Sequence, residues 1–184
     1  MRETELVFVV RSSLEDERPE IDFTRPKCRS IDWLRIDEVL RGIRSPNEYE
    51  VPSIMAEAKD VSSWHFFSVA GTFGLFSDVA VRAIGLLAFR SFDLFPAFIN
   101  GAKYHFLKAG RMLACFDRAE SEIVPYQHDP SRIMQVTKYA FHKPLIEEHT
   151  LFCIPEVIEL FATESVCRAV EATGLKGFRF DPVA

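Results

Sequence analysis

The stretch FDLFPAFINGAKYHFLKAGRMLACF, residues 92–116, decides how this chain is expected to fold. Aromatic residues are typical of strands, and Asn100-Gly101 is a strong signal for a two-residue hairpin turn. We therefore predict strands over 92–99 and 102–108 joined by that turn. Ala109-Gly110 predicts a second turn into a third strand over 112–116, so that three successive strands form an antiparallel meander.

Two segments combine a helix-capping residue, an acid in the first turn and an amphipathic pattern. They predict helices begun by side-chain caps over Ser77–Leu87 and Thr163–Thr173. Gly174 is expected to end the second helix in a left-handed conformation, before a short closing strand over Gly177–Phe180. Both segments also show the order strand, cap, helix. This order fits an internal repeat or the common pattern of any capped helix.

The remaining elements are shorter. Apolar runs predict strands over residues 6–10, 133–141 and 151–154, and Ser30 is a suitable cap for a helix over residues 31–41. Together these elements predict an α+β fold, in which an antiparallel sheet of hairpins and a meander carries two or three short amphipathic helices.

Length and composition indicate one globular unit. The chain has 184 residues, of which 48% are hydrophobic and 27% are charged, as is usual for a folded domain. We predict a single domain over residues 1–184, with a less regular part over 1–60 and the main core over 61–184. Residues 61–110 hold 11 of the 23 aromatic residues. The net charge of −5 lacks the basic surplus of a nucleic-acid-binding protein, so we expect no nucleic-acid partner.

The sequence predicts a cytoplasmic protein without a membrane partner. The N-terminus MRETE is too acidic, and the apolar run after it too short, for a signal peptide. The longest nearly uncharged stretch, residues 61–81, contains Ser, Thr, Gly, His and Asp and does not resemble a membrane span. No CxxC pair is present, and isolated cysteines among apolar neighbours are expected to be reduced thiols. These are Cys28, Cys115, Cys153 and Cys167.

Signatures of catalysis are missing from the sequence. It contains no GxSxG elbow, P-loop, GxGxxG or HExxH motif, and its five histidines show no metal-ligand spacing, so we expect neither a cofactor nor a metal. Two catalytic alternatives remain open, namely Cys115 as a nucleophile with a downstream histidine, and Glu147-Glu148 as a carboxylate pair. We favour a core thiol for Cys115, because a catalytic thiolate requires a helix N-terminus or a cationic neighbour.

One region has a distinctive surface character. Residues 144–167 contain five acids and no Lys or Arg, together with apolar residues such as Leu145 and Val157. Carboxylates mixed with apolar anchors suit docking to a basic protein surface, although an ordinary solvated face is equally compatible with the pattern. The predicted partner-binding residues are Glu147, Glu148, Glu156 and Glu159.

Four motifs occur in an order that resembles a bacterial protein family. They are an aromatic strand with an internal proline at 93–98, a G-x-x-Y hairpin at 101–104, the step Cys115-x-Asp117-x-x-x-Ser121, and a tail at 173–180 that reads TGLKGFRF. The chain resembles, over roughly residues 60–182, the eleventh family of immunity proteins attached to polymorphic toxin systems. The residues that match the family pattern, and for which we expect structural roles, are Asp117, Ser121, Gly174, Gly177, Phe178, Arg179 and Phe180.

This resemblance implies a non-enzymatic protein. It implies that the chain binds a cognate toxin and neutralises it by stoichiometric occlusion in the producing or a neighbouring cell. We expect a turn cap in which Asp117 or Ser121 accepts hydrogen bonds from nearby backbone N–H groups. The alternatives are an uncharacterised enzyme using Cys115 or a carboxylate pair, and a non-catalytic ligand-binding module. The sequence gives no oligomeric state and no identity for the toxin.

Overall fold

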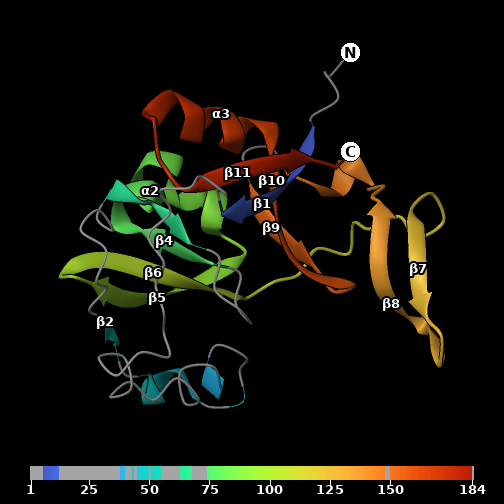
Figure 1. The fold of residues 1–184 in the computed structure, drawn as a ribbon, viewed down its shortest axis with the longest axis horizontal. Coiled ribbons are helices and arrows are strands. Elements are labelled where there is room, and N and C mark those ends of the chain that lie inside the picture. Colours follow the sequence, from blue (N-terminus) through green and yellow to red (C-terminus); the bar gives the residue numbers. More distant parts are fainter. Residues whose placement is uncertain are drawn as a thin grey trace.

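The chain forms a mixed α and β fold built mostly from antiparallel strands, with two α-helices among the described residues. A computed structural model describes residues 6–12, 38–39, 43, 45–49, 51–54, 63–67, 74–147 and 150–183. Figure 1 shows the arrangement and labels the elements. The predicted α+β class is confirmed at this level.

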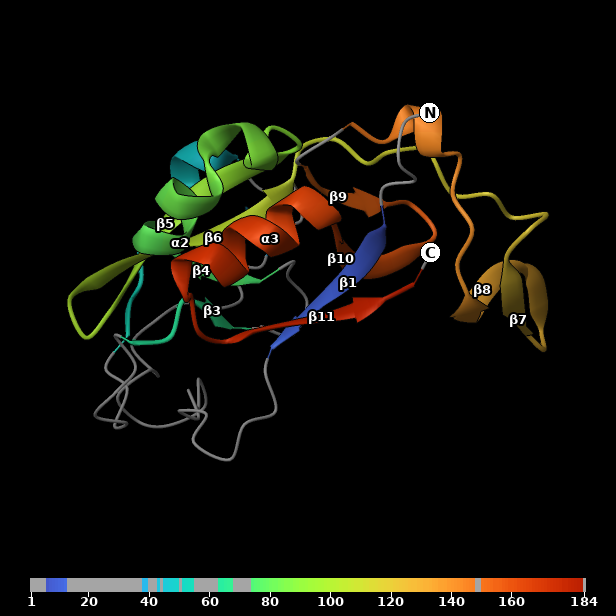
Figure 2. The ribbon, with the colours of Figure 1, turned by 90° about the horizontal axis from the view of Figure 1, so that it is seen from above.

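A four-stranded antiparallel sheet joins the two ends of the described chain. Its strand order is β11-β1-β10-β9, so the N-terminal strand lies between two C-terminal strands (Figure 2). The bounds are β1 Val7–Ser12, β9 Leu151–Ile154, β10 Val157–Thr163 and β11 Phe178–Pro182. The strands expected near residues 6–10, 151–154 and 177–180 are present, and β10 is the strand that the strand–cap–helix pattern predicts before Thr163, without bounds.

A second sheet has the order β2-β5-β6-β4-β3. The predicted hairpin is its centre, and Asn100 and Gly101 both have positive φ angles of 49° and 80°, as a two-residue type I′ turn requires. Pro96 lies in β5, where its carbonyl oxygen accepts a hydrogen bond from the Tyr49 hydroxyl on the edge away from β6. The bounds are β2 Ser53–Ile54, β3 Phe66–Phe67, β4 Leu75–Ser77, β5 Phe92–Ile99 and β6 Ala102–Ala109.

The prediction of a third meander strand over residues 112–116 is wrong. Residues 111–115 have no strand assignment, and β4 occupies the place beside β6. The segment instead follows the edge of the first sheet, where the Leu113 N–H donates to the Cys153 carbonyl oxygen. An apolar extended segment can satisfy its backbone against any neighbouring edge, so its apolar character alone did not identify its partner.

Two α-helices pack together over both sheets. Helix α2 spans Asp78–Ile84 and helix α3 spans Glu164–Thr173, each directly after a strand, as the strand–cap–helix pattern predicts. Helix α2 stops at Gly85, earlier than the predicted Leu87, and a 3-10 turn over Leu86–Phe89 follows. Buried side chains from both sheets and both helices form one hydrophobic cluster, so the helices join the two sheets.

The two helices begin differently. At α2, the Ser77 Oγ accepts a hydrogen bond from the Ala80 N–H at 3.0 Å, as predicted. Thr163 is the N-cap of α3 but makes no such bond, so the predicted side-chain cap is wrong. Its Oγ1 instead accepts the Thr150 N–H at 3.0 Å and lies 3.1 Å from the Ser165 Oγ. Thr163 therefore ties the loop before β9 to the end of β10.

This bond gives Thr163 a different contribution to stability from that of a cap. We expect Thr163→Val, which keeps the side-chain shape but removes the hydroxyl, to cost about 1–3 kcal/mol, because the Thr150 N–H is left buried without its acceptor. Urea denaturation followed by circular dichroism measures this cost, and a Thr163→Ser variant is the control that retains the hydroxyl. Equal stability of Thr163→Val and the wild type would contradict the assigned role.

A separate two-stranded hairpin projects from the two sheets in both views (Figures 1 and 2). Its strands are β7, Glu122–Tyr126, and β8, Asp129–Lys138. Strand β7 was not predicted, and the strand expected over 133–141 begins earlier and ends earlier. Most residues of this hairpin are exposed, and its pairing contains several register shifts. A hairpin with little buried surface gives a weak sequence signal.

The helix predicted over residues 31–41 falls almost entirely outside the described residues, apart from the helical Glu38 and Val39. Short 3-10 turns occur at Pro46–Glu48 and Lys143–Leu145. Within the described part of the chain, no helix is long and apolar enough to cross a membrane.

Candidate functional site

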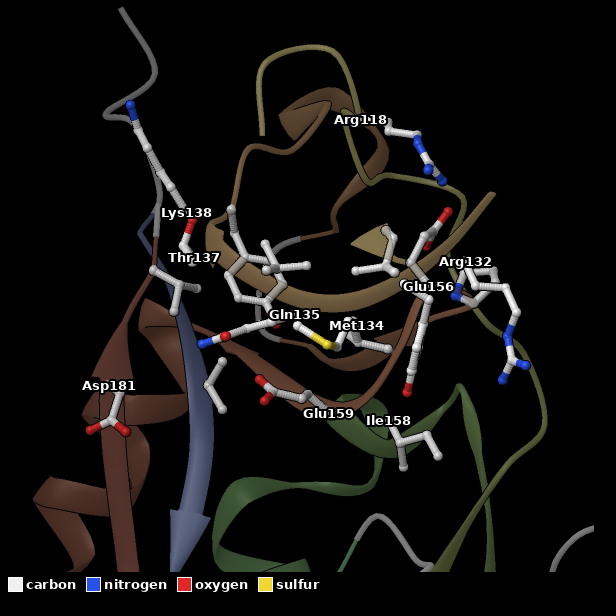
Figure 3. A pocket seen from close by; sticks show the side chains of 18 of the residues that line it. Arg118, Arg132, Met134, Gln135, Thr137, Lys138, Glu156, Ile158, Glu159 and Asp181 are labelled. Atoms are coloured by element: carbon white, nitrogen blue, oxygen red, sulfur yellow. The ribbon is translucent and has the colours of Figure 1, made fainter. Parts of the chain in front are cut away.

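A groove of about 950 Å³ lies between the projecting hairpin and the four-stranded sheet. We call it the β8 groove, and Figure 3 shows it from close by. Residues 131–139 of β8 and its end line one side, and residues 155–159 of the β9–β10 turn and the start of β10 line the other. Residues of β1 and the end of β11 complete the lining. The groove therefore joins segments that are far apart in sequence.

The hairpin side of the groove is held in place at its base by the motif residues Asp117 and Ser121. The Asp117 Oδ1 accepts hydrogen bonds from the backbone N–H groups of Ala119 and Glu120, at 3.1 and 3.2 Å. The Ser121 hydroxyl donates to the Asp117 carbonyl oxygen at 2.6 Å and accepts the Ala140 N–H at 2.9 Å. The bonds of the Asp117 Oδ1 fix the turn that enters the hairpin, and the bond between Ser121 and Ala140 links this turn to the segment that leaves the hairpin.

Exposed apolar side chains lie along both sides. Ile158 at the start of β10 is 79% exposed, and Met134 and Tyr126 on the hairpin are 54% and 44% exposed. Strand β10 contains a register irregularity between Val157 and Phe161, where its pairing with β9 is interrupted. A bulge of this kind turns side chains away from the regular alternation of a strand. Ile158 is thereby presented to solvent beside the groove.

One end of the groove carries a charged network that is already paired. Arg11 contacts the Glu159 carboxylate at 2.9 Å and the Asp181 carboxylate at 3.2 Å, and Asp181 also contacts Arg179 at 3.0 Å. Burial, and then the nearby Glu159 carboxylate, raise the pKa of Tyr139, so its phenol stays protonated at neutral pH. These ion pairs connect β1, β10 and β11 at this end of the groove, while the Glu159 Oε2 and the Arg179 Nε are buried without a hydrogen-bond partner among the described residues.

The other end holds Arg118, Arg132 and Glu156 (Figure 3). The Arg118 guanidinium donates to the carbonyl oxygens of Ser131 and Pro130, and the Arg132 guanidinium lies 5.3 Å from the centre of the Tyr126 ring. Neither guanidinium forms an ion pair with a carboxylate of the described residues. One oxygen of Glu156, Oε2, is buried and has no hydrogen-bond partner there.

The structure separates the four acids that were predicted to bind a partner. Glu156 and Glu159 line the β8 groove, with Glu159 already paired to Arg11. Glu147 lies elsewhere and pairs with Arg90 at 2.5 Å, and Glu148 lies outside the described residues. The stretch without Lys or Arg therefore does not form an acid-only surface, because arginines from other segments come to it.

The β8 side of the groove was missed from the sequence. Tyr126, Arg132 and Met134 belong to no sequence motif. Only their occurrence together on one exposed strand pair indicates an interface. Tyr, Arg and Met are enriched at protein interfaces, which is the signal that was available.

No residue of the tail motif lines the β8 groove, although its Arg179 pairs with the groove residue Asp181. Gly174 ends α3 with φ 64° and ψ 27°, the left-handed conformation that was predicted. Phe178 stacks on Phe66 with ring centres 5.0 Å apart and on Phe180 at 5.9 Å, and Arg179 pairs with Asp181. The motif thus contributes packing and strand pairing.

Comparison with known proteins adds one match. Residues 88–184 match the immunity protein family Imm11. The chain belongs to the Imm11 family. No curated protein matches the chain. The matched segment begins later than the resemblance predicted from about residue 60, and it contains every residue that lines the β8 groove except Val9 and Arg11.

The cysteine alternative loses support in this Imm11 protein. Cys115 is fully buried, and burial raises the pKa of its thiol to about 11. Burial has the same effect on Cys153. A thiol in this environment stays protonated at neutral pH and is a poor nucleophile. Cys28 lies outside the described residues.

A second polar cluster surrounds Asp78 at the start of α2. The His105 ring Nε2 lies 2.9 Å from Asp78 Oδ1, Arg82 contacts Oδ2, and the Lys103 Nζ lies 3.6 Å away. The hydrogen bond from His105, followed by that from Arg82, lowers the pKa of Asp78 from 3.8 to about 2. None of these residues lines the β8 groove, and we assign the cluster to stability.

The Asp78 cluster predicts a pH dependence. A carboxyl with a lowered pKa in the folded state stabilises the fold above its ordinary pKa, and this stabilisation is lost as the pH falls through the folded value. We expect the urea midpoint of the wild type to fall between about pH 4 and pH 2, and Asp78→Asn to start lower and to show a smaller change over that interval. An undiminished acid slope in Asp78→Asn would contradict this assignment.

Proposed function

We propose that this protein is an immunity protein that binds the cognate toxin of a bacterial polymorphic toxin system and neutralises it by covering a functional surface. The observation that carries this proposal is the family match over residues 88–184. Occlusion needs a complementary surface and no reaction, which agrees with the protonated, buried state of Cys115. The enzyme and the ligand-binding module remain the alternatives.

The β8 groove is the surface that we propose for docking. It combines exposed Tyr, Arg and Met side chains, a residue set typical of binding hot spots, with the exposed Ile158. Four basic and three acidic side chains line it, namely Arg11, Arg118, Arg132, Lys138, Glu156, Glu159 and Asp181. We therefore propose that the toxin presents a surface of mixed charge rather than a uniformly basic one.

We also propose that the protein acts in the cytoplasm and needs neither a cofactor nor a nucleic acid to bind the toxin. Three cysteines of the described residues, Cys115, Cys153 and Cys167, are free thiols. Free thiols are usual in a reducing compartment. Each thiol is buried, so none of them is exposed for cross-linking to a partner.

Coexpression tests the proposal. Each toxin-domain protein encoded beside the gene of this chain is expressed in a sensitive host with and without the chain, and growth is measured. We expect rescue by one of them and a one-to-one complex by size-exclusion chromatography with light scattering. Titration of the purified toxin with this protein separates the alternatives. Occlusion needs one molar equivalent of this protein to inhibit all of the toxin, whereas an enzyme would inactivate the toxin at a far lower molar ratio. Absence of both rescue and binding for every such toxin would overturn the proposal.

A further inference from the structure

Among the described residues, strand β8 has a second edge with which no strand pairs, although the Arg118 guanidinium donates to the Ser131 carbonyl oxygen near its start. It belongs to a sheet of two strands, in which β7 pairs with it on one side. Nine consecutive residues, 131–139, line the groove. Successive side chains of a regular strand point to opposite faces, so a strand that met the groove with one face only would line it with alternate residues, whereas β8 lines it continuously. Among the described residues, no backbone hydrogen bond links 131–139 to any strand other than β7.

An open strand edge is a template for another extended chain. Its backbone N–H and C=O groups can pair with a strand from a partner, and the neighbouring side chains then select the sequence of that strand. The β8 groove has a volume of about 950 Å³, near the upper end of the range of ligand pockets. The start of β10 lies across from β8 and forms the second side of the β8 groove.

The side chains that line the β8 groove indicate the chemistry of the segment that would bind there. Met134 and Ile158 offer exposed apolar surface to an apolar side chain. The end that holds Arg118, Arg132 and Glu156 carries two guanidinium groups and one carboxylate, which leaves one net positive charge (Figure 3). A carboxylate from the occupant would complement this end, since guanidinium and carboxylate groups form two parallel hydrogen bonds.

We infer that the β8 groove binds an extended segment of the cognate toxin by strand addition to the free edge of β8. The segment carries an apolar side chain that packs on Met134 and Ile158, and an acidic side chain that pairs with Arg118 and Arg132. This inference rests on the proposed function, since it names how the toxin is held. It also assigns a positioning role to Asp117 and Ser121, which hold the hairpin at its base.

Hydrogen exchange on the wild-type complex tests the backbone part. The probe is the toxin-domain protein recovered by the coexpression experiment, mixed with the full chain. We expect amide exchange in residues 132–139 to slow at least tenfold in the complex, while exchange in β5 and β6 stays unchanged. A complex that leaves the β8 amides unprotected would overturn strand addition, although the proposed function would stand. Failure of the wild type to bind any such toxin would overturn both.

Substitutions test the side-chain part. Ile158→Glu and Met134→Glu are each expected to raise the Kd at least tenfold with an unchanged circular dichroism spectrum, because both side chains are exposed in the free protein. Leu87→Glu is the matched control. Leu87 is an exposed apolar residue similar in size to Ile158, but it lies on the 3-10 turn after α2. Equal affinity of all three variants would overturn the assigned groove.

The charge of the occupant is tested at Arg132. Arg132→Glu should slow association and reverse the salt dependence of the association rate, whereas Arg111→Glu, at an exposed position outside the groove, should change it little. Faster association of Arg132→Glu would show a basic occupant and overturn this part. Analytical ultracentrifugation of the free chain tests whether a second copy occupies the groove. We expect a monomer, and a dimer with protected β8 amides would overturn the toxin as the occupant.

Discussion

Gly177→Ala is expected to lower the free energy of unfolding by about 3 kcal/mol or more. Gly177 has φ 94°, and a Cβ added there would lie 2.6 Å from the Phe66 carbonyl oxygen and 2.9 Å from the Trp64 ring. A left-handed backbone costs about 1–2 kcal/mol for a residue with a side chain. The clash with backbone atoms in a filled interior adds about 1–3 kcal/mol, because β3 and the start of β11 must separate.

Gly174 is the matched control for Gly177. It also has a positive φ, 64°, but a Cβ there would have no atom within 4 Å. Gly174→Ala should therefore cost only the backbone term of about 1–2 kcal/mol, and Gly174→Asn less, since Asn tolerates this conformation. Chemical denaturation of the three variants gives the comparison. Equal losses at Gly174 and Gly177 would show that the close approach to Phe66 does not matter.

The second large effect is expected at Phe76. Its side chain has no exposed surface, and its ring lies 4.8 Å from that of Phe66, 5.3 Å from that of Phe89 and 5.6 Å from that of Phe178. These rings come from β3, the 3-10 turn after α2, and β11, so Phe76 connects both sheets. We expect Phe76→Ala to cost about 3–5 kcal/mol, through lost burial and the cavity that remains.

Phe98→Ala is the control for Phe76→Ala. Phe98 lies in β5 and is 37% exposed, so its removal should cost about 1 kcal/mol or less. Thermal melts followed by near-ultraviolet circular dichroism also report whether the remaining aromatic rings stay ordered. A loss of less than 1 kcal/mol in Phe76→Ala would mean that the ring cluster is not the centre of the core.

The elements that could be predicted from the sequence are those fixed by nearby residues. Asn100-Gly101 can adopt positive φ angles, so the β5–β6 hairpin follows from two residues and the apolar runs beside them. Ser77 and Gly174 likewise mark the start of α2 and the end of α3 through local backbone chemistry. The cap predicted at Thr163 failed because Thr150, 13 residues away, holds the hydroxyl.

The candidate site was only partly predictable, since its two sides come from separate segments. The acidic stretch pointed to Glu156 and Glu159, which do line the groove, but it gave no sign that Arg11 would pair with Glu159. Arg132 and Met134 lie on an exposed hairpin without a periodic apolar pattern. Which strand edge stays open depends on the whole topology, and a sequence read segment by segment does not contain that information.

The position of β1 sets the order of events during translation. Phe8 pairs with both Ala162 and Pro182, so β1, which is synthesised before the other described strands, has no paired strand until almost all the described chain has followed it. Pairings between such distant residues are slow to form, because the intervening chain must first be ordered. The hairpins β5–β6 and β7–β8 are available earlier. A nascent chain stalled before residue 157 would leave the apolar strand β1 without either of the strands that it pairs with, and it would lack most of the second side of the β8 groove.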